Sequence, residues 1–105
     1  MNEISTASLL SEIRAACASV ADPEFGLSVD DLGLIYEVTL EGAAVTVAMT
    51  LTTPHCPAGD VIVDGVRAAV AAVPGVEEVA VRLVWDPGWT PDMVSARGRE
   101  QLGWR

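Results

Sequence analysis

The sequence predicts an α+β domain of two layers, in which helices cover one face of a small mixed sheet. Two observations lead to this prediction. Apolar residues recur at helical spacing in two segments, and they alternate with polar residues in three others. The predicted order is helix, strand, strand, helix, strand, with a short helix at the C-terminus. At this length residues 1–105 are expected to form a single domain.

The first helix is expected over about residues 6–20, in the segment TASLLSEIRAACASV. Leu9, Ile13 and Cys17 recur on one helical face, so Cys17 is interpreted as a small apolar residue of the core. The next segment, ADPEFGLSVDDLG over residues 21–33, combines carboxylates with one proline and two glycines. It is expected to be a loop.

Two alternating runs then predict a β-hairpin. LIYEVTLE over residues 34–41 and VTVAMTL over residues 45–51 place apolar side chains at every second position. Glu41-Gly42-Ala43 lies between the two runs and is expected to turn the chain.

The second helix is expected over about residues 58–73 and stops at Pro74-Gly75. Residues 78–85 alternate again and predict the third strand. Strand, helix and strand in succession imply a right-handed parallel crossover. The tail is expected to form a loop and then a final helix from about Pro91, with Thr90 as its cap.

Charge and composition exclude several classes of function. Fifteen acidic residues and six arginines give a net charge of −9, and the chain contains no lysine. Such a chain repels nucleic acid, and without lysine it has neither a Schiff base nor a GxxxxGK phosphate loop. No apolar run is long enough to span a membrane, and the N-terminus lacks the features of a signal peptide. A cytoplasmic protein that binds small ligands, metals or basic protein surfaces is therefore expected.

The stretch LTTPHCPAGD, residues 51–60, concentrates the chemically reactive side chains. Pro57 is expected at the first helical position, which places Cys56 at or near the helix N-cap. Unpaired amides of the first turn and the helix dipole would stabilise a thiolate there. Cys56 is therefore the predicted functional thiol, whereas His55 is open to interpretation as a surface residue without a role.

A closed zinc site within one chain is not expected, because four Cys or His ligands are not available nearby. An incomplete site fits better. Cys56 could hold iron or an iron–sulfur cluster transiently with carboxylates of residues 22–31, or with a second Cys56 across a homodimer. Asp22, Glu24 and Asp31 are expected to converge beside Cys56, although Asp22 could instead only cap its turn. A Cys–His hydrolase is disfavoured, because His55 directly precedes the cysteine.

Three segments in the chain form recognisable motifs: DPEFGLSVDDLGLIYEV, VAMTLTTPHCP and PGVEEVAVRLVWDPGWTPDMVS. They closely resemble the small iron–sulfur cluster assembly family, which includes SufT-like and PaaD-like proteins. The chain is also similar to the eukaryotic cytosolic iron–sulfur targeting subunit. The resemblance covers about residues 9–102. It implies an α+β fold, a role in the maturation of iron–sulfur or other metal proteins, and carrier or client proteins as partners.

The resemblance also implies which residues matter, and it treats Cys56 as the functional one. The shared positions carry over onto Asp22, Pro23, Glu24, Asp31, Gly33, Thr52, Thr53 and Cys56, and in the C-terminal motif onto Trp85, Pro87, Trp89 and Asp92. Two departures stand out. The chain lacks the cysteine-rich C-terminal zinc segment of PaaD-like members, and residue 55 is more usually glycine.

The leading hypothesis is an accessory factor, not an enzyme, that delivers or targets clusters to client proteins through Cys56. Asp22, Glu24, Asp31, Thr52 and Thr53 are its predicted site neighbours. The alternative is an interaction module that docks through WDPGWTPDM, because aromatic residues are frequent at binding hot spots. A thiol redox enzyme is the third hypothesis. The three tryptophans could also cover the open face of the sheet.

Overall fold

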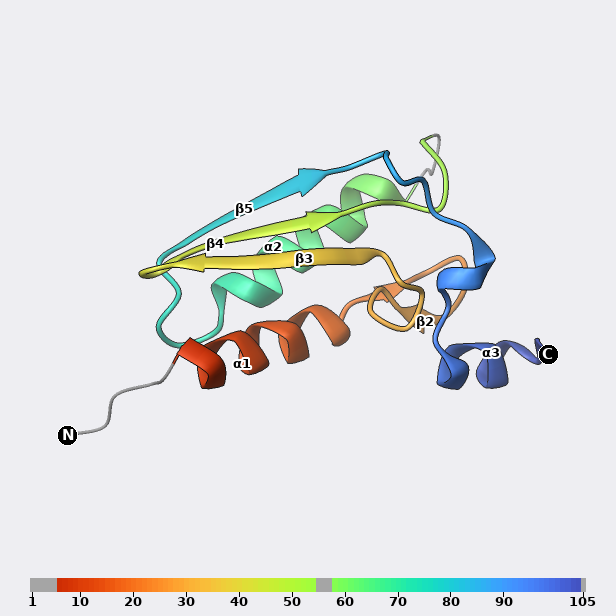
Figure 1. Ribbon diagram of the computed structural model, residues 1–105, viewed down its shortest axis with the longest axis horizontal. Coiled ribbons are helices and arrows are strands. Elements are labelled where there is room, and N and C mark those ends of the chain that lie inside the picture. Colours follow the sequence, from red (N-terminus) through yellow and green to blue (C-terminus); the bar gives the residue numbers. More distant parts are fainter. Residues whose placement is uncertain (1–5, 55–57, 105) are drawn as a thin grey trace.

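The computed structural model describes residues 6–54 and 58–104. Two long helices cover one face of a three-stranded sheet in this part of the chain (Figure 1). Helix α1 (Thr6–Ala18) packs against the first strand of that sheet and against α2 (Gly59–Ala71), which in turn packs against the last strand. The predicted two-layer α+β fold is confirmed.

The sheet is mixed, as predicted. Its strands β3 (Ile35–Glu41), β4 (Ala44–Met49) and β5 (Glu78–Leu83) lie in the order β3-β4-β5. β3 and β4 are antiparallel and joined by a tight turn at Gly42, whose φ of 61° favours glycine. β5 runs parallel to β4 after the α2 crossover. β3 and β5 are therefore the two edges of the sheet.

The core lies between the sheet and the two helices. Among the long elements, α1, α2 and the central strand β4 supply buried side chains, whereas the edge strands β3 and β5 supply only partly buried ones. Cys17 is 1% exposed, which confirms its interpretation as a core residue. The largest buried side chains are Ile13, Leu32, Leu34, Met49, Ile62, Val29, Val45, Val47, Val66 and Val70.

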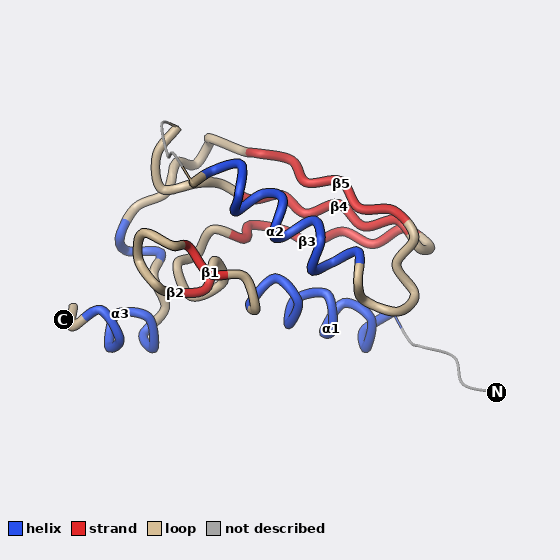
Figure 2. The backbone as a smooth tube through the Cα atoms, turned by 180° about the vertical axis from the view of Figure 1, so that it is seen from behind, coloured by secondary structure: helices blue, strands red, loops and turns tan. Residues whose placement is uncertain are grey.

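The acidic segment is not a plain loop. β1 (Ala21–Asp22) and β2 (Leu27–Ser28) pair in an antiparallel ribbon that closes the turn between them. Figure 2 shows this ribbon beyond the end of α1. Strands of two residues have no detectable alternation, so the sequence pattern could not predict them.

α2 begins at Gly59 with Ala58 as its N-cap, close to the predicted start at about residue 58, whereas the expected places of Pro57 and Cys56 lie outside the described residues. The predicted start of the final helix is wrong. At the C-terminus, Thr90 and Pro91 begin only the 3-10 turn η1 (Pro91–Met93).

The final helix, α3 (Ala96–Leu102), starts later than predicted, with Ser95 as its cap. The amide of Gly98 donates to the Ser95 Oγ over 3.0 Å, which satisfies one of the free amides of the first turn. None of the described helices is long and apolar enough to cross a membrane.

Candidate functional site

The predicted thiol cannot be placed, because His55, Cys56 and Pro57 lie outside the described residues. The chain enters this segment from the end of β4 and leaves it into α2. Thr52 is half-buried and Thr53 is exposed, and both lie between β4 and the segment.

Asp22 is the most unusual of the predicted site residues. Its side chain is completely buried in β1. The Oδ1 atom accepts a hydrogen bond from the Glu24 amide over 2.8 Å, so the turn-capping interpretation holds for this oxygen. The Oδ2 atom is buried and has no hydrogen-bond partner among the residues that the structure describes. Burying an unpaired carboxylate oxygen costs folding free energy, which makes a role beyond capping worth testing.

The turn that follows Asp22 presents its neighbours differently. The Asp22 carbonyl accepts from the amides of Phe25 and Gly26, over 3.3 and 2.8 Å, and this closes the turn tightly. Pro23 and Glu24 are exposed on it. The turn thus buries one carboxylate of the DPE motif and turns the other outward.

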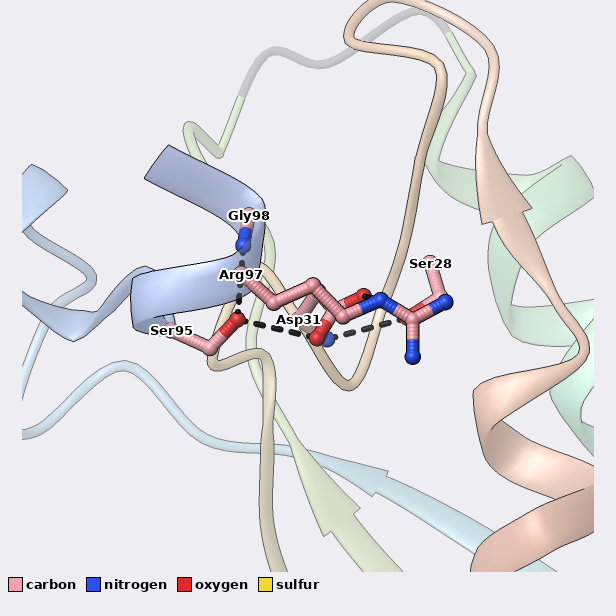
Figure 3. Close-up of polar contacts among 5 residues, drawn as sticks. All are labelled: Ser28, Asp31, Ser95, Arg97 and Gly98. Carbon is pink, nitrogen blue, oxygen red and sulfur yellow. Dashed lines mark hydrogen bonds and ion pairs between the residues drawn. The ribbon is translucent and has the colours of Figure 1, made fainter. Parts of the chain in front are cut away.

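Asp31 is engaged with the C-terminal segment. Figure 3 shows its carboxylate beside Ser95, whose Oγ donates to Asp31 Oδ1 over 2.9 Å. The Ser95 amide also donates to the Asp31 carbonyl over 2.7 Å, and the Asp31 amide donates to the Ser28 Oγ over 3.0 Å. Arg97 adds an ion pair at 3.9 Å that is largely exposed and therefore contributes little. The contacts of Asp31 indicate a residue that holds two segments together.

Trp89 belongs to the same junction. Its indole N–H donates to the Leu32 carbonyl over 2.6 Å, and its ring packs against Phe25 with centroids 6.2 Å apart. Phe25 lies in the turn that follows Asp22. The C-terminal segment therefore contacts the turn that carries the buried carboxylate.

A second contact is made by Tyr36, whose hydroxyl donates to the Pro87 carbonyl over 2.7 Å. Burial raises the pKa of the Tyr36 phenol, so the hydroxyl keeps the proton that it donates. Gly33, with a φ of 80°, lies directly against the backbone of Met93. We name the contacts of residues 31–36 with residues 87–98 the C-terminal clasp.

The remaining residues of the WDPGWTPDM motif face outward. Trp85 is 45% exposed. Asp92 is exposed and forms an ion pair with Arg99 at 3.7 Å. Of the tryptophans, Trp89 is the one that packs inward, and it packs onto residues 25–32 and not onto the open face of the sheet.

The described residues include no cluster of three or more His, Cys, Asp or Glu side chains that could hold a metal ion. Within residues 6–54 and 58–104, Asp22, Glu24 and Asp31 thus do not make a metal site by themselves. Burial raises the pKa of the Cys17 thiol, and the nearby Asp30 charge raises it further. Cys17 is therefore a poor ligand and a poor nucleophile at neutral pH.

Sequence reasoning missed Tyr36 and Ser95. A serine directly before the helix-forming run ARGREQL is a recognisable cap signal, so Ser95 could have been found. Tyr36 gave no such signal, because it occupies an ordinary apolar position in an alternating strand.

Comparisons with known proteins agree with one another. A family model described as iron-sulfur cluster assembly protein matches residues 10–81. The chain is 42% identical over 85 residues to the Fe-S protein maturation auxiliary factor SufT of Staphylococcus aureus, covering 80% of this chain and 97% of that protein. It is 40% identical over 96 residues to the Fe-S protein maturation auxiliary factor YitW of Bacillus subtilis, covering 90% of this chain and 94% of that one.

Solved structures match over nearly the whole chain. A domain of unknown function from Bacillus anthracis superposes with a TM-score of 0.89 at 34% identity, covering 99% of this chain and 100% of that one. A conserved hypothetical protein from Thermotoga maritima gives a TM-score of 0.81 at 36% identity, covering 98% and 99%.

Proposed function

Because the chain belongs to the iron–sulfur cluster assembly protein family, we propose that it is an accessory factor in the maturation of iron–sulfur proteins. The family resemblance read from the sequence is thereby confirmed. In the proposed role the chain delivers or targets clusters to client proteins through Cys56 and catalyses no reaction of its own. The cluster, or iron, is cargo that the chain holds only in passage.

The structural observation that supports this role is Oδ2 of Asp22, which is buried and has no hydrogen-bond partner within residues 6–54 and 58–104. Selection for stability alone would remove or pair such an atom, since burial of an unpaired polar group is costly. We propose that Asp22 serves the thiol site by accepting, at Oδ2, a hydrogen bond that forms when binding of cargo or partner rearranges the turn around it. Glu24, Thr52 and Thr53 are proposed as neighbours of the same site.

Transfer in this proposal is ligand exchange. The Cys56 thiolate forms a bond to a cluster iron as a thiolate of the donor leaves, and the reverse exchange passes the cluster to the client. No electron is transferred. A carrier or client with a basic face would gain association rate from the net charge of −9, and salt would reduce this gain.

Cys56→Ser is expected to abolish the maturation of an iron–sulfur client enzyme in cells that depend on this chain. The matched control is Cys17→Ala, which removes the other thiol from a buried, apolar position and should leave maturation intact. Client activity is measured per amount of client protein, and both variants are checked for folding by circular dichroism. Full client activity with folded Cys56→Ser would refute the role of this thiol.

Asp22→Asn separates function from stability. The amide oxygen can still accept from the Glu24 N–H, whereas the carboxylate at Oδ2 is lost. We expect the free energy of unfolding to stay within about 1 kcal/mol of the parent, while client activity falls at least about tenfold. Urea unfolding and the client assay measure the two quantities. A variant that matures clients normally would show that Asp22 only caps its turn.

Docking through the WDPGWTPDM motif remains the second candidate function, and the exposure of Trp85 favours it. If Trp85→Ala prevented co-purification of a client while Cys56→Ser left client maturation intact, the interaction module would replace the thiol hypothesis.

A further inference from the structure

The outer edge of β5 is an unpaired strand edge. β5 is the last strand of the sheet, and in the described part of the chain no segment pairs with its far side (Figure 1). Six consecutive residues pair regularly with β4, from Glu78 to Leu83, without a bulge. An exposed and regular edge is a template for another strand.

The opposite edge is less regular than the β5 edge. The register of β3 shifts between Ile35 and Glu37, and such irregularities discourage the addition of a strand. Helix packing does not distinguish the edges, because α1 packs against β3 and α2 packs against β5. Of the two edges, β5 is therefore the one available for pairing.

The direction of the free backbone groups follows from two hydrogen bonds. The amides of Glu78 and Val84 donate to the Ala43 and Met49 carbonyls, over 3.2 and 2.8 Å, and so point toward β4. Backbone groups alternate in direction along a strand. The amides and carbonyls of Val79, Val81 and Leu83 therefore point away from the sheet.

The charged side chains of β5 are arranged so that two copies of the strand can place opposite charges next to each other. Suppose two β5 strands pair antiparallel about a two-fold axis at Ala80. Val79 of one copy then faces Val81 of the other, and the outward backbone groups of both can form hydrogen bonds. In the same register Glu78 of each copy lies opposite Arg82 of the other. Opposite charges at facing positions stabilise a pair of strands.

Both charged side chains are free for this contact. Glu78 and Arg82 are exposed, and neither forms an ion pair with another residue that the structure describes. The partly exposed side chains of Val79 and Val81 would lose further surface to water. A two-fold contact uses the same patch on both copies, as this register requires.

We propose that the β5 edge pairs with the β5 edge of a second copy of this chain, so that two three-stranded sheets join in a homodimer. The dimer is weak and salt-dependent, because each copy carries a net charge of −9 and added salt screens their repulsion. The contact needs neither Cys56 nor a cluster.

One consequence concerns the proposed function and rests on it. The two β5 strands point in opposite directions, and β4 ends beside the end of β5 in each copy. The residues that follow β4 therefore start from opposite ends of the joined sheet. The ends of the two β4 strands thus lie apart in this dimer, so each copy would handle its cargo separately.

The test is a charge swap measured by sedimentation equilibrium. Arg82→Glu places two glutamates opposite each other in each half of the contact, and Glu78→Arg places two arginines there. Each variant alone should dimerise at least about tenfold more weakly than the parent, and an equimolar mixture should recover dimer, because the mixed pair restores opposite charges. Parent dimerisation should strengthen with added salt.

Amide hydrogen exchange gives a second readout. With rising protein concentration, exchange should slow at Val79 and Val81, whose amides point outward, and stay unchanged at Ala80 and Arg82. A parent chain that remains monomeric at all salt concentrations would overturn the proposal. So would dimers that both variants leave unchanged, or protection that appears only when a different protein is added.

Discussion

Gly33→Ala is expected to lower the free energy of unfolding by about 3 kcal/mol, which corresponds to a fall in melting temperature of about 10 °C or more. Two costs add. Gly33 has a φ of 80°, which a residue with a side chain adopts only with strain. A Cβ at this position would also overlap the Met93 carbonyl oxygen and approach the Met93 Cβ to 2.8 Å. Neither Met93 atom lies at the far end of a flexible side chain. The backbone of the C-terminal clasp must therefore shift to make room for the added Cβ.

Gly42→Ala is the matched control. Gly42 also has a positive φ, of 61°, but an added Cβ meets nothing within 4 Å. This variant therefore carries the strain without the overlap and should lose only about 1 kcal/mol. Urea unfolding followed by circular dichroism measures both variants. Equal losses at the two positions would show that the contact between Gly33 and Met93 is not tight.

Trp89→Ala is expected to destabilise the fold by about 3 kcal/mol. The substitution removes the ring that packs against Phe25, and it takes the N–H donor away from the carbonyl of the fully buried Leu32. Trp89→Phe keeps most of the packing and should lose about 1 to 2 kcal/mol, the part that belongs to the hydrogen bond.

Trp85→Ala provides the comparison within the same motif. Trp85 is 45% exposed, so its truncation should change the free energy of unfolding by no more than about 0.5 kcal/mol. Circular dichroism is the appropriate probe, because all these variants alter tryptophan fluorescence. If Trp89→Ala were as stable as Trp85→Ala, Trp89 would be a docking residue and not part of the clasp. If Trp89→Ala is destabilised as expected, loss of partner binding by this variant does not prove that Trp89 is a docking residue.

The periodic part of the fold could be predicted from the sequence. The hairpin and the crossover each span enough residues for alternation or helical spacing to emerge, and Ile62, Val66 and Val70 are buried as that spacing requires. The start of the last helix is harder to predict. Pro91 is a residue that favours a helix start, yet α3 begins later, at Ala96.

The candidate site could be predicted only as a set of residues. The burial of Asp22 depends on a ribbon of two short strands, and a pattern in one segment does not reveal how that ribbon packs. Likewise, Asp31 and Ser95 lie 64 residues apart in the chain, and nothing local in either segment indicates their hydrogen bond. Contacts between distant segments are decided by tertiary packing, which periodicity does not describe.

The C-terminal clasp has a consequence for the order in which the chain becomes folded during synthesis. Ser95 bonds to Asp31, and Val94 is buried in the core, so the loop after β2 receives its cover only from residues made near the end. The hairpin and α1 can form while the ribosome is still elongating, whereas Leu32 and Asp31 gain their hydrogen bonds from Trp89 and Ser95 only after those residues have been made. A nascent chain halted shortly after β5 should therefore expose this loop to proteases and chaperones, and release of the last residues should end that exposure.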